Sequence, residues 1–102
     1  MTVDDLLKQV KLYRRVNQER VRKAYAFAER AHAGQTRMTG EPYISHPLAV
    51  AMMMAKYQAD EDSIIAALLH DVAEDTPVTL SQIEHEFGKS VSKMVDALTK
   101  LP

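Results

Sequence analysis

The amino-acid sequence predicts an all-α fold, and three observations support this prediction. Apolar residues recur at three- and four-residue spacing through most of the 102 residues. Glycine and proline are rare, with 3 and 4 residues respectively, and runs of β-branched residues are short. The chain is 46% hydrophobic, which is enough to build a core. We therefore expect five to six helices packed as a bundle, forming one domain or part of one.

The first two predicted helices are recognised from an apolar stripe and a capping residue. Residues 4–14 form the first helix, which has Leu6, Leu7 and Val10 on one side. Asn17 is the predicted N-cap of the second helix. That helix ends near Gly34, where a loop with two glycines and a proline begins.

Proline positions place the next two helices. The dipeptide His46-Pro47 opens the third helix, because proline is tolerated in the first helical turn. The fourth helix runs from Ser63 to about Asp75. It ends at Thr76, because a residue that precedes proline avoids the helical region of backbone conformation.

The last two predicted helices follow a capping signal and a glycine. Thr79 and Gln82 have the spacing of a capping box and open a short helix that ends at Phe87. Gly88 is the expected C-cap of this helix. The final helix is marked by apolar residues at helical spacing, which are Val91, Met94, Val95 and Leu98.

Composition excludes several classes of protein. The net charge of −1 gives no reason to expect binding to nucleic acid or to an anionic membrane surface. The absence of cysteine excludes a disulfide framework and thiolate chemistry. The segment MTVDDLLKQV carries early acids and no long apolar run, so it does not predict a signal peptide. We expect a cytoplasmic protein.

Charged residues gather at the end of the fourth predicted helix, in the run ALLHDVAEDTP, residues 67–77. His70 and Glu74 are four residues apart, and so are Asp71 and Asp75, so each pair is expected on one face of the helix. Carboxylates at the C-terminal end of a helix gain nothing from the helix dipole. Their position therefore argues for a cation close by.

Two interpretations of this segment compete. Taken alone, acids at a helix end are more often a solvated surface than a metal site. His46 changes that balance, because it begins the third helix. If the third and fourth helices pack antiparallel, His46 meets His70 and Asp71. Two imidazoles and a carboxylate suit manganese, zinc or iron better than calcium. The metal site is then the better interpretation.

Three segments occur in the order HAGQTRMTGEPYISHPLAVA, AALLHDVAEDT and FGKSVSKMVDALTKL. Together they closely resemble the amino-terminal hydrolase domain of the RelA/SpoT homologue proteins, which belongs to the HD phosphohydrolase superfamily. The resemblance runs from about Ala24 to Leu101. It implies an all-α helical bundle of the HD-domain type. It also implies an enzyme of the stringent response that uses Mn²⁺ to remove pyrophosphate from the 3′ position of ppGpp and pppGpp, giving GDP or GTP.

The resemblance also implies roles for individual residues. His46, His70 and Asp71 match three metal ligands of the family. Glu74 and Asp75 match its catalytic carboxylate pair, which positions or activates the attacking water. A metal ion can lower the pKa of a bound water from about 15.7 to ~7, which supports such a reaction near neutral pH.

The loop before His46 carries the implied substrate contacts. Arg37, in the sequence RMTG, matches the arginine that packs against guanine, and Gly40 shapes its loop. Met38 stands where many relatives carry lysine or serine. Without the resemblance we would interpret Arg37 as a solvated cation. We interpret His32 as a structural residue under this loop, and Tyr43 as a support for the His46 segment.

Two features of the family fall beyond this chain. Its fourth metal ligand is an aspartate on a later helix, and a nucleotide-binding asparagine lies near that ligand. We therefore expect residues 1–102 to be the amino-terminal part of the hydrolase domain, with the second half absent. Apolar surface on the third to fifth helices should then be exposed, and we expect a homodimer that covers it.

Two alternatives to the alarmone hydrolase remain. One is an HD-type phosphohydrolase that acts on another nucleotide, which the RxxG loop and the TKL segment argue against. The other is an inactive or weakly active module that binds metal or nucleotide without turnover. Preference between ppGpp and pppGpp stays open.

Overall fold

The computed structural model describes residues 1–100, which form seven helices. These are α1 (Val3–Lys11), α2 (Gln18–Ala31), α3 (Ser45–Lys56), α4 (Glu61–Leu69), α5 (Val72–Asp75), α6 (Leu80–Phe87) and α7 (Lys89–Thr99). The all-α prediction is confirmed. The number of helices exceeds the predicted five to six, because the fourth predicted helix is divided into α4 and α5 after Leu69.

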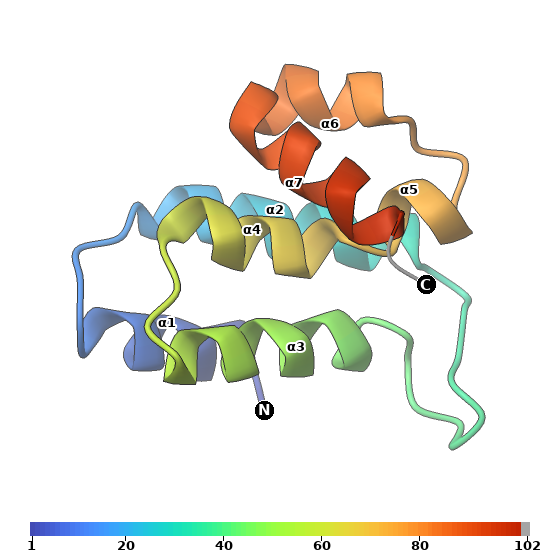
Figure 1. The fold of residues 1–102 in the computed structure, drawn as a ribbon. Coiled ribbons are helices and arrows are strands. Elements are labelled where there is room, and N and C mark those ends of the chain that lie inside the picture. Colours follow the sequence, from blue (N-terminus) through green and yellow to red (C-terminus); the bar gives the residue numbers. More distant parts are fainter. Residues whose placement is uncertain (101–102) are drawn as a thin grey trace.

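Helix α4 lies at the centre of the bundle and contacts α2, α3 and α7. Figure 1 shows α2 and α4 side by side, with α1 and α3 on one side of them and α6 and α7 on the other. Six consecutive residues of α4 are buried, from Ile64 to Leu69. A helix that is apolar all round belongs in the interior, so the sequence of α4 accounts for its central position.

Most helix boundaries follow the predicted capping residues. Asn17 accepts a hydrogen bond from the Arg20 amide, and Thr79 forms the predicted capping box with Gln82. Gly88 caps α6 at φ +97°, a conformation that side chains rarely adopt. The fourth helix begins earlier than predicted. Asp60 accepts from the Ser63 amide, so α4 begins before the predicted residue.

The start of the chain also differs in detail from the prediction. Thr2 and Asp5 form a capping box that the sequence analysis did not identify. Helix α1 ends at Lys11 and not at Arg14. The predicted apolar side is present, because Leu6, Leu7 and Val10 are buried.

The segment between α2 and α3 folds back on itself. An isolated bridge pairs Thr36 with Pro42, and the Arg37 amide donates to the Glu41 carbonyl at 2.9 Å. Gly40 closes this turn at φ +88° and donates to the Arg37 carbonyl at 2.8 Å. The turn returns the chain so that Tyr43 lies just before α3 and His46 lies in its first turn.

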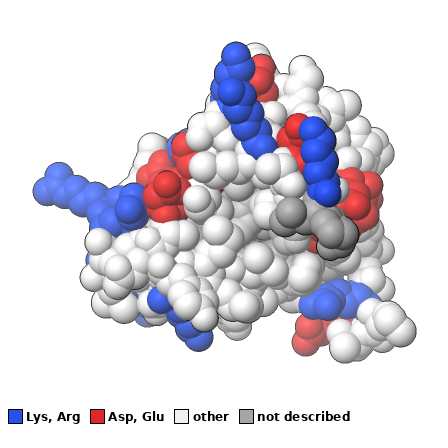
Figure 2. Space-filling model, in the orientation of Figure 1, with Lys and Arg blue, Asp and Glu red and all other residues white. Residues whose placement is uncertain are grey.

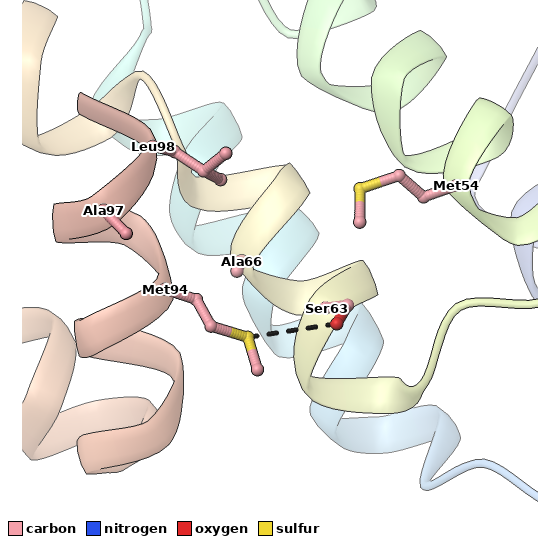
Figure 3. Close-up of a pocket in the computed structure, with 6 residues that line it drawn as sticks. All are labelled: Met54, Ser63, Ala66, Met94, Ala97 and Leu98. Carbon is pink, nitrogen blue, oxygen red and sulfur yellow. Dashed lines mark hydrogen bonds between the residues drawn. The ribbon is translucent and has the colours of Figure 1, made fainter. Parts of the chain in front are cut away.

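An uncharged area occupies the middle of one face of the molecule, with acidic and basic side chains around its edges (Figure 2). A hollow of about 340 Å³ opens between α3, α4 and α7 (Figure 3), lined by Met54, Ser63, Ala66, Met94, Ala97 and Leu98. The expected homodimer through apolar surface stays a prediction. None of the helices in residues 1–100 has the length and apolarity required to cross a membrane.

Candidate metal centre

Antiparallel packing of α3 against α4 brings His46, His70 and Asp71 together. Figure 1 shows the two helices running in opposite directions, so the start of one lies beside the end of the other. One ligand atom from each of the three residues lies within 4.8 Å of the others. His70 Nε2 is 3.2 Å and His46 Nε2 is 3.4 Å from Asp71 Oδ2. The structure thus joins all three residues that the sequence analysis selected as a metal group.

A break in the helix allows neighbouring residues to face one point. Adjacent side chains of a continuous helix diverge by about 100°. Here α4 ends at Leu69 and α5 begins at Val72, with His70 and Asp71 between them. The His70 ring nitrogen Nδ1 donates to the Ala67 carbonyl at 2.6 Å. That carbonyl is the one to which the Asp71 amide would donate in an uninterrupted helix.

The predicted continuous helix through Asp75 is therefore wrong. A continuous helix would stack His70 on Glu74 and Asp71 on Asp75. The structure instead turns His70 and Asp71 toward His46, and α5 carries Glu74 and Asp75 as a separate short helix.

The protonation of His70 is set by its two neighbours. Nδ1 faces the Ala67 carbonyl, so Nε2 is the nitrogen that faces Asp71. The hydrogen bond with Asp71 raises the pKa of His70 against the opposing effect of burial. In metal-binding histidines, the ring nitrogen that does not bind the metal commonly donates to a backbone carbonyl. Nδ1 of His70 has this arrangement.

His46 sits in a different environment. Burial lowers the pKa of His46, and this outweighs the opposite influence of Asp71. The Arg37 guanidinium lies 3.5 Å from His46 Nδ1 and also lowers that pKa. A lowered pKa keeps the imidazole neutral, which is the form that binds metals.

Asp71 is the carboxylate shared by this cluster. Burial raises the pKa of Asp71, but hydrogen bonds from His70 and Tyr43 outweigh it and leave the pKa below its usual value. The Tyr43 hydroxyl donates to Asp71 Oδ2 at 2.9 Å and lies 3.2 Å from Asp75 Oδ2. Burial and these two carboxylates raise the pKa of Tyr43, so its hydroxyl remains a donor.

The remaining predicted residues lie around this cluster at different distances. Asp75 joins it through Tyr43. Arg37 is exposed and touches His46. Gly40 forms the turn that presents Arg37. Glu74 lies exposed on α5, and within residues 1–100 no hydrogen bond joins it to the cluster.

The sequence analysis did not predict the central role of Tyr43 in this cluster. It expected Tyr43 to support the His46 segment, whereas the hydroxyl contacts Asp71 and Asp75 directly. The available signal was its position three residues before His46. The rings of Tyr43 and His46 lie edge to face with centroids 5.9 Å apart.

The three residues fit a transition-metal ion. Nitrogen and oxygen ligands at ~2.1 Å from one ion lie roughly 3.0–4.2 Å apart. The two separations from Asp71 Oδ2, 3.2 and 3.4 Å, fall in that range. Two imidazoles with one carboxylate suit manganese, iron or zinc better than calcium. The cluster could therefore hold a metal ion.

Comparisons with known proteins identify a matching family and several relatives. Residues 24–102 match the family model described as HD domain. The bifunctional (p)ppGpp synthase/hydrolase SpoT of Escherichia coli (strain K12) is 53% identical over 83 residues, which cover 81% of this chain and 12% of that protein. The guanosine-3′,5′-bis(diphosphate) 3′-pyrophosphohydrolase of Aquifex aeolicus is 49% identical over 83 residues, which also cover 81% of this chain and 12% of that protein.

A third relative extends the match along this chain. The GTP pyrophosphokinase rsh of Brucella ovis is 43% identical over 98 residues, which cover 95% of this chain and 13% of that protein. The chain thus spans only about an eighth of the length of these curated relatives. The resemblance to RelA/SpoT homologue proteins is confirmed as homology. Since the family model covers most of the chain, this protein belongs to the HD domain family.

Proposed function

We propose that this chain carries the hydrolytic site of a Mn²⁺-dependent (p)ppGpp 3′-pyrophosphohydrolase, which releases pyrophosphate and leaves GDP or GTP. The observation that supports it best is the meeting of His46, His70 and Asp71 at one point. Support also comes from a relative, 49% identical, which is named guanosine-3′,5′-bis(diphosphate) 3′-pyrophosphohydrolase. The cytoplasmic location expected from the sequence belongs to the same proposal.

In this proposal His46 Nε2, His70 Nε2 and Asp71 Oδ2 hold the metal ion. A divalent ion bound there supplies Lewis acidity that can bring the pKa of water down to ~7. The Ala67 carbonyl fixes the His70 ring through Nδ1, and Tyr43 fixes the Asp71 carboxylate. The ligand atoms are thus held in place before an ion arrives.

Asp75 is the proposed acceptor of a proton from the attacking water. Its Oδ2 atom lies 3.2 Å from the Tyr43 hydroxyl, whose single proton goes to the nearer Asp71 Oδ2. The side chain is exposed, so the other oxygen can reach water and substrate. Glu74 is the proposed second member of the pair, and its side chain is exposed on α5.

Arg37 is the proposed contact for the substrate. Its guanidinium lies beside His46 at the edge of the centre, and the side chain is exposed. A flat guanidinium can stack on guanine, and its charge offsets the negative charge of a polyphosphate. Gly40 supports this position through the turn that it closes.

We further propose that residues 1–102 are the amino-terminal part of a larger hydrolase domain. In this proposal the three ligands, His46, His70 and Asp71, leave positions on the ion open. An aspartate from a later helix, as in the family that the sequence resembles, would complete the set.

The proposal is tested by measuring pyrophosphate release from ppGpp and pppGpp with added Mn²⁺. His70→Ala and Asp71→Ala should abolish release. His85→Ala is the matched control, because His85 is an exposed histidine on α6. Equal turnover by His70→Ala and the wild type would contradict the proposal. GTP, GDP and ATP in parallel reactions distinguish an alarmone hydrolase from a hydrolase of other nucleotides.

A metal- or nucleotide-binding module without turnover is the second candidate. The observation that favours it is Glu74, which the structure leaves outside the hydrogen-bonded cluster of residues 1–100. This module would bind Mn²⁺ with an affinity that depends on Asp71 but would release no pyrophosphate.

A further inference from the structure

A buried histidine lies beneath the candidate metal centre and is not part of the metal group. His32 follows α2 and is only 2% exposed. Its ring stacks on Tyr43, with centroids 4.5 Å apart and planes tilted by 31°. Its Nδ1 atom lies 3.2 Å from Gln35 Oε1. Within the part of the chain that the structure describes, its Nε2 atom is buried without a hydrogen-bond partner.

Gln35 decides which ring nitrogen of His32 carries the proton. The Gln35 side-chain nitrogen donates to the Asp75 backbone carbonyl at 3.1 Å. A carbonyl can only accept, so the other end of the Gln35 amide, Oε1, is the atom that faces His32. His32 Nδ1 must therefore be the donor, and the buried Nε2 atom of the neutral ring carries the lone pair.

Two routes lead from His32 to the residues of the proposed site. The first passes through the stacked ring of Tyr43, whose single hydroxyl proton goes to Asp71 Oδ2 at 2.9 Å in preference to Asp75 Oδ2 at 3.2 Å. The second passes through Gln35 to the backbone of Asp75. The backbone supports both routes, because the Tyr43 amide donates to the Gln35 carbonyl at 3.0 Å.

Histidine at position 32 leaves a buried polar atom, Nε2, without a hydrogen-bond partner among the described residues. A buried acceptor without a partner destabilises the fold. A phenyl ring would give the same stack on Tyr43 without that cost. The imidazole adds one thing that a phenyl ring lacks, which is the Nδ1 proton given to Gln35.

We propose that His32 is a positioning residue, which orients Asp71 through Tyr43 and Asp75 through Gln35. This inference rests on the proposed function, because it assigns a task to those two carboxylates. The stack acts through the Tyr43 hydroxyl on the Asp71 oxygen that holds the metal. The Nδ1 hydrogen bond acts through Gln35 on the backbone of Asp75, which places the carboxylate that accepts the proton.

Three variants separate the two routes. His32→Phe keeps the ring stack and removes the donor. His32→Asn keeps a donor near the Nδ1 position and removes the ring. His32→Ala removes both. Mn²⁺ affinity, measured by electron paramagnetic resonance of the free ion, reports on Asp71. The kcat for ppGpp hydrolysis at saturating Mn²⁺ reports on Asp75.

We expect opposite patterns from the first two variants. His32→Phe should keep Mn²⁺ affinity within about threefold and lower kcat about tenfold, since changes to groups that orient ligands typically cost 10- to 100-fold. His32→Asn should weaken Mn²⁺ binding about tenfold and keep more of the kcat than His32→Phe. A merely structural residue would instead change both readouts together in proportion to lost thermal stability, and that result would overturn the proposal.

A double-mutant cycle with Tyr43→Phe gives a second test. If the stack acts through the Tyr43 hydroxyl, His32→Asn should weaken Mn²⁺ binding about tenfold in the wild type but less than twofold in Tyr43→Phe. Equal losses in both backgrounds would overturn this route. The cycle needs no turnover and does not use His32→Ala, which leaves a cavity and is the variant most at risk of failing to fold.

The outcomes also separate this inference from the proposed function. Wild-type protein that binds Mn²⁺ without releasing pyrophosphate contradicts the proposed reaction, while the cycle in Mn²⁺ affinity still tests His32. Active wild-type protein with unaltered His32→Asn and His32→Phe variants overturns the inference alone. Wild-type protein that binds no Mn²⁺ overturns both.

Discussion

Tyr43 and Asp71 are 28 residues apart in the sequence, and the Tyr43 hydroxyl donates to Asp71 Oδ2 at 2.9 Å. The same oxygen atom faces Nε2 of both His46 and His70. Burial raises the pKa of Tyr43, as do the carboxylates beside it, so the hydroxyl stays a donor near neutral pH. Tyr43 thus fixes the orientation of the carboxylate that the two imidazoles share.

The first prediction concerns this hydrogen bond. Tyr43→Phe keeps the ring and removes the donor, so Mn²⁺ affinity should fall about tenfold. Isothermal titration calorimetry with Mn²⁺ measures the change. Tyr57→Phe is the matched control, because Tyr57 is 87% exposed and should leave the affinity unaltered. An unaltered affinity in Tyr43→Phe would show that Asp71 does not depend on this bond.

The second prediction concerns metal addition and removal. An ion that binds only the folded chain should stabilise it by about 2.7 kcal/mol at a concentration 100 times its Kd. Thermal unfolding with Mn²⁺ and then with excess chelator measures this effect. Asp71→Ala should lose the stabilisation, because it removes the shared ligand oxygen. Equal stabilisation of Asp71→Ala by Mn²⁺ would place the ion elsewhere.

The third prediction concerns Arg20, which joins three helices. Its guanidinium contacts Glu61 at 2.9 Å and Asp62 at 2.6 Å, and donates to the Phe87 carbonyl at 2.7 Å. Arg20→Ala should lower the free energy of unfolding by about 1–2 kcal/mol, because partly buried acceptors lose their donor. Urea denaturation measures the loss.

Arg22 provides the control for Arg20. Arg22 lies two residues along the same helix and pairs with Asp4, and both side chains of this pair are largely exposed. Exposed pairs contribute little, so Arg22→Ala should cost under about 0.5 kcal/mol. Similar losses for the two variants would mean that the Arg20 contacts do not join the helices.

Local signals in the sequence predicted much of the fold. Asn17, Thr79 with Gln82, and Gly88 each act through residues within four positions, so their geometry could be inferred from spacing. The division of the fourth helix could not. It depends on the His70 ring and its bond to Ala67, in a segment without glycine or an internal proline.

The candidate site was predicted only in part for a similar reason. His46 meets His70 and Asp71 because two neighbouring helices pack antiparallel, which a short connection makes easy to predict. The supporting contacts join residues that no periodicity relates. Gln35 bonds to Asp75 over 40 positions, and Tyr43 to Asp71 over 28. Such pairings require the completed fold.

The last prediction concerns pH and the cap of α4. Asp60 accepts hydrogen bonds from Ser63, and these lower the pKa of Asp60 below its ordinary value of 3.8. A carboxylate whose pKa is lowered by folding stabilises the fold above its unfolded pKa, and that stabilisation is lost as pH falls through the folded value. Asp60→Ala should therefore lower the free energy of unfolding by about 1 kcal/mol near pH 7 and by progressively less below about pH 4.

Asp60→Asn is the control, because asparagine also caps helices but does not titrate. The stability of this variant should therefore depend less on pH than that of the wild type. Urea denaturation from pH 7 to pH 3 measures all three proteins, and a cost of Asp60→Ala that stays constant over this range would contradict the prediction.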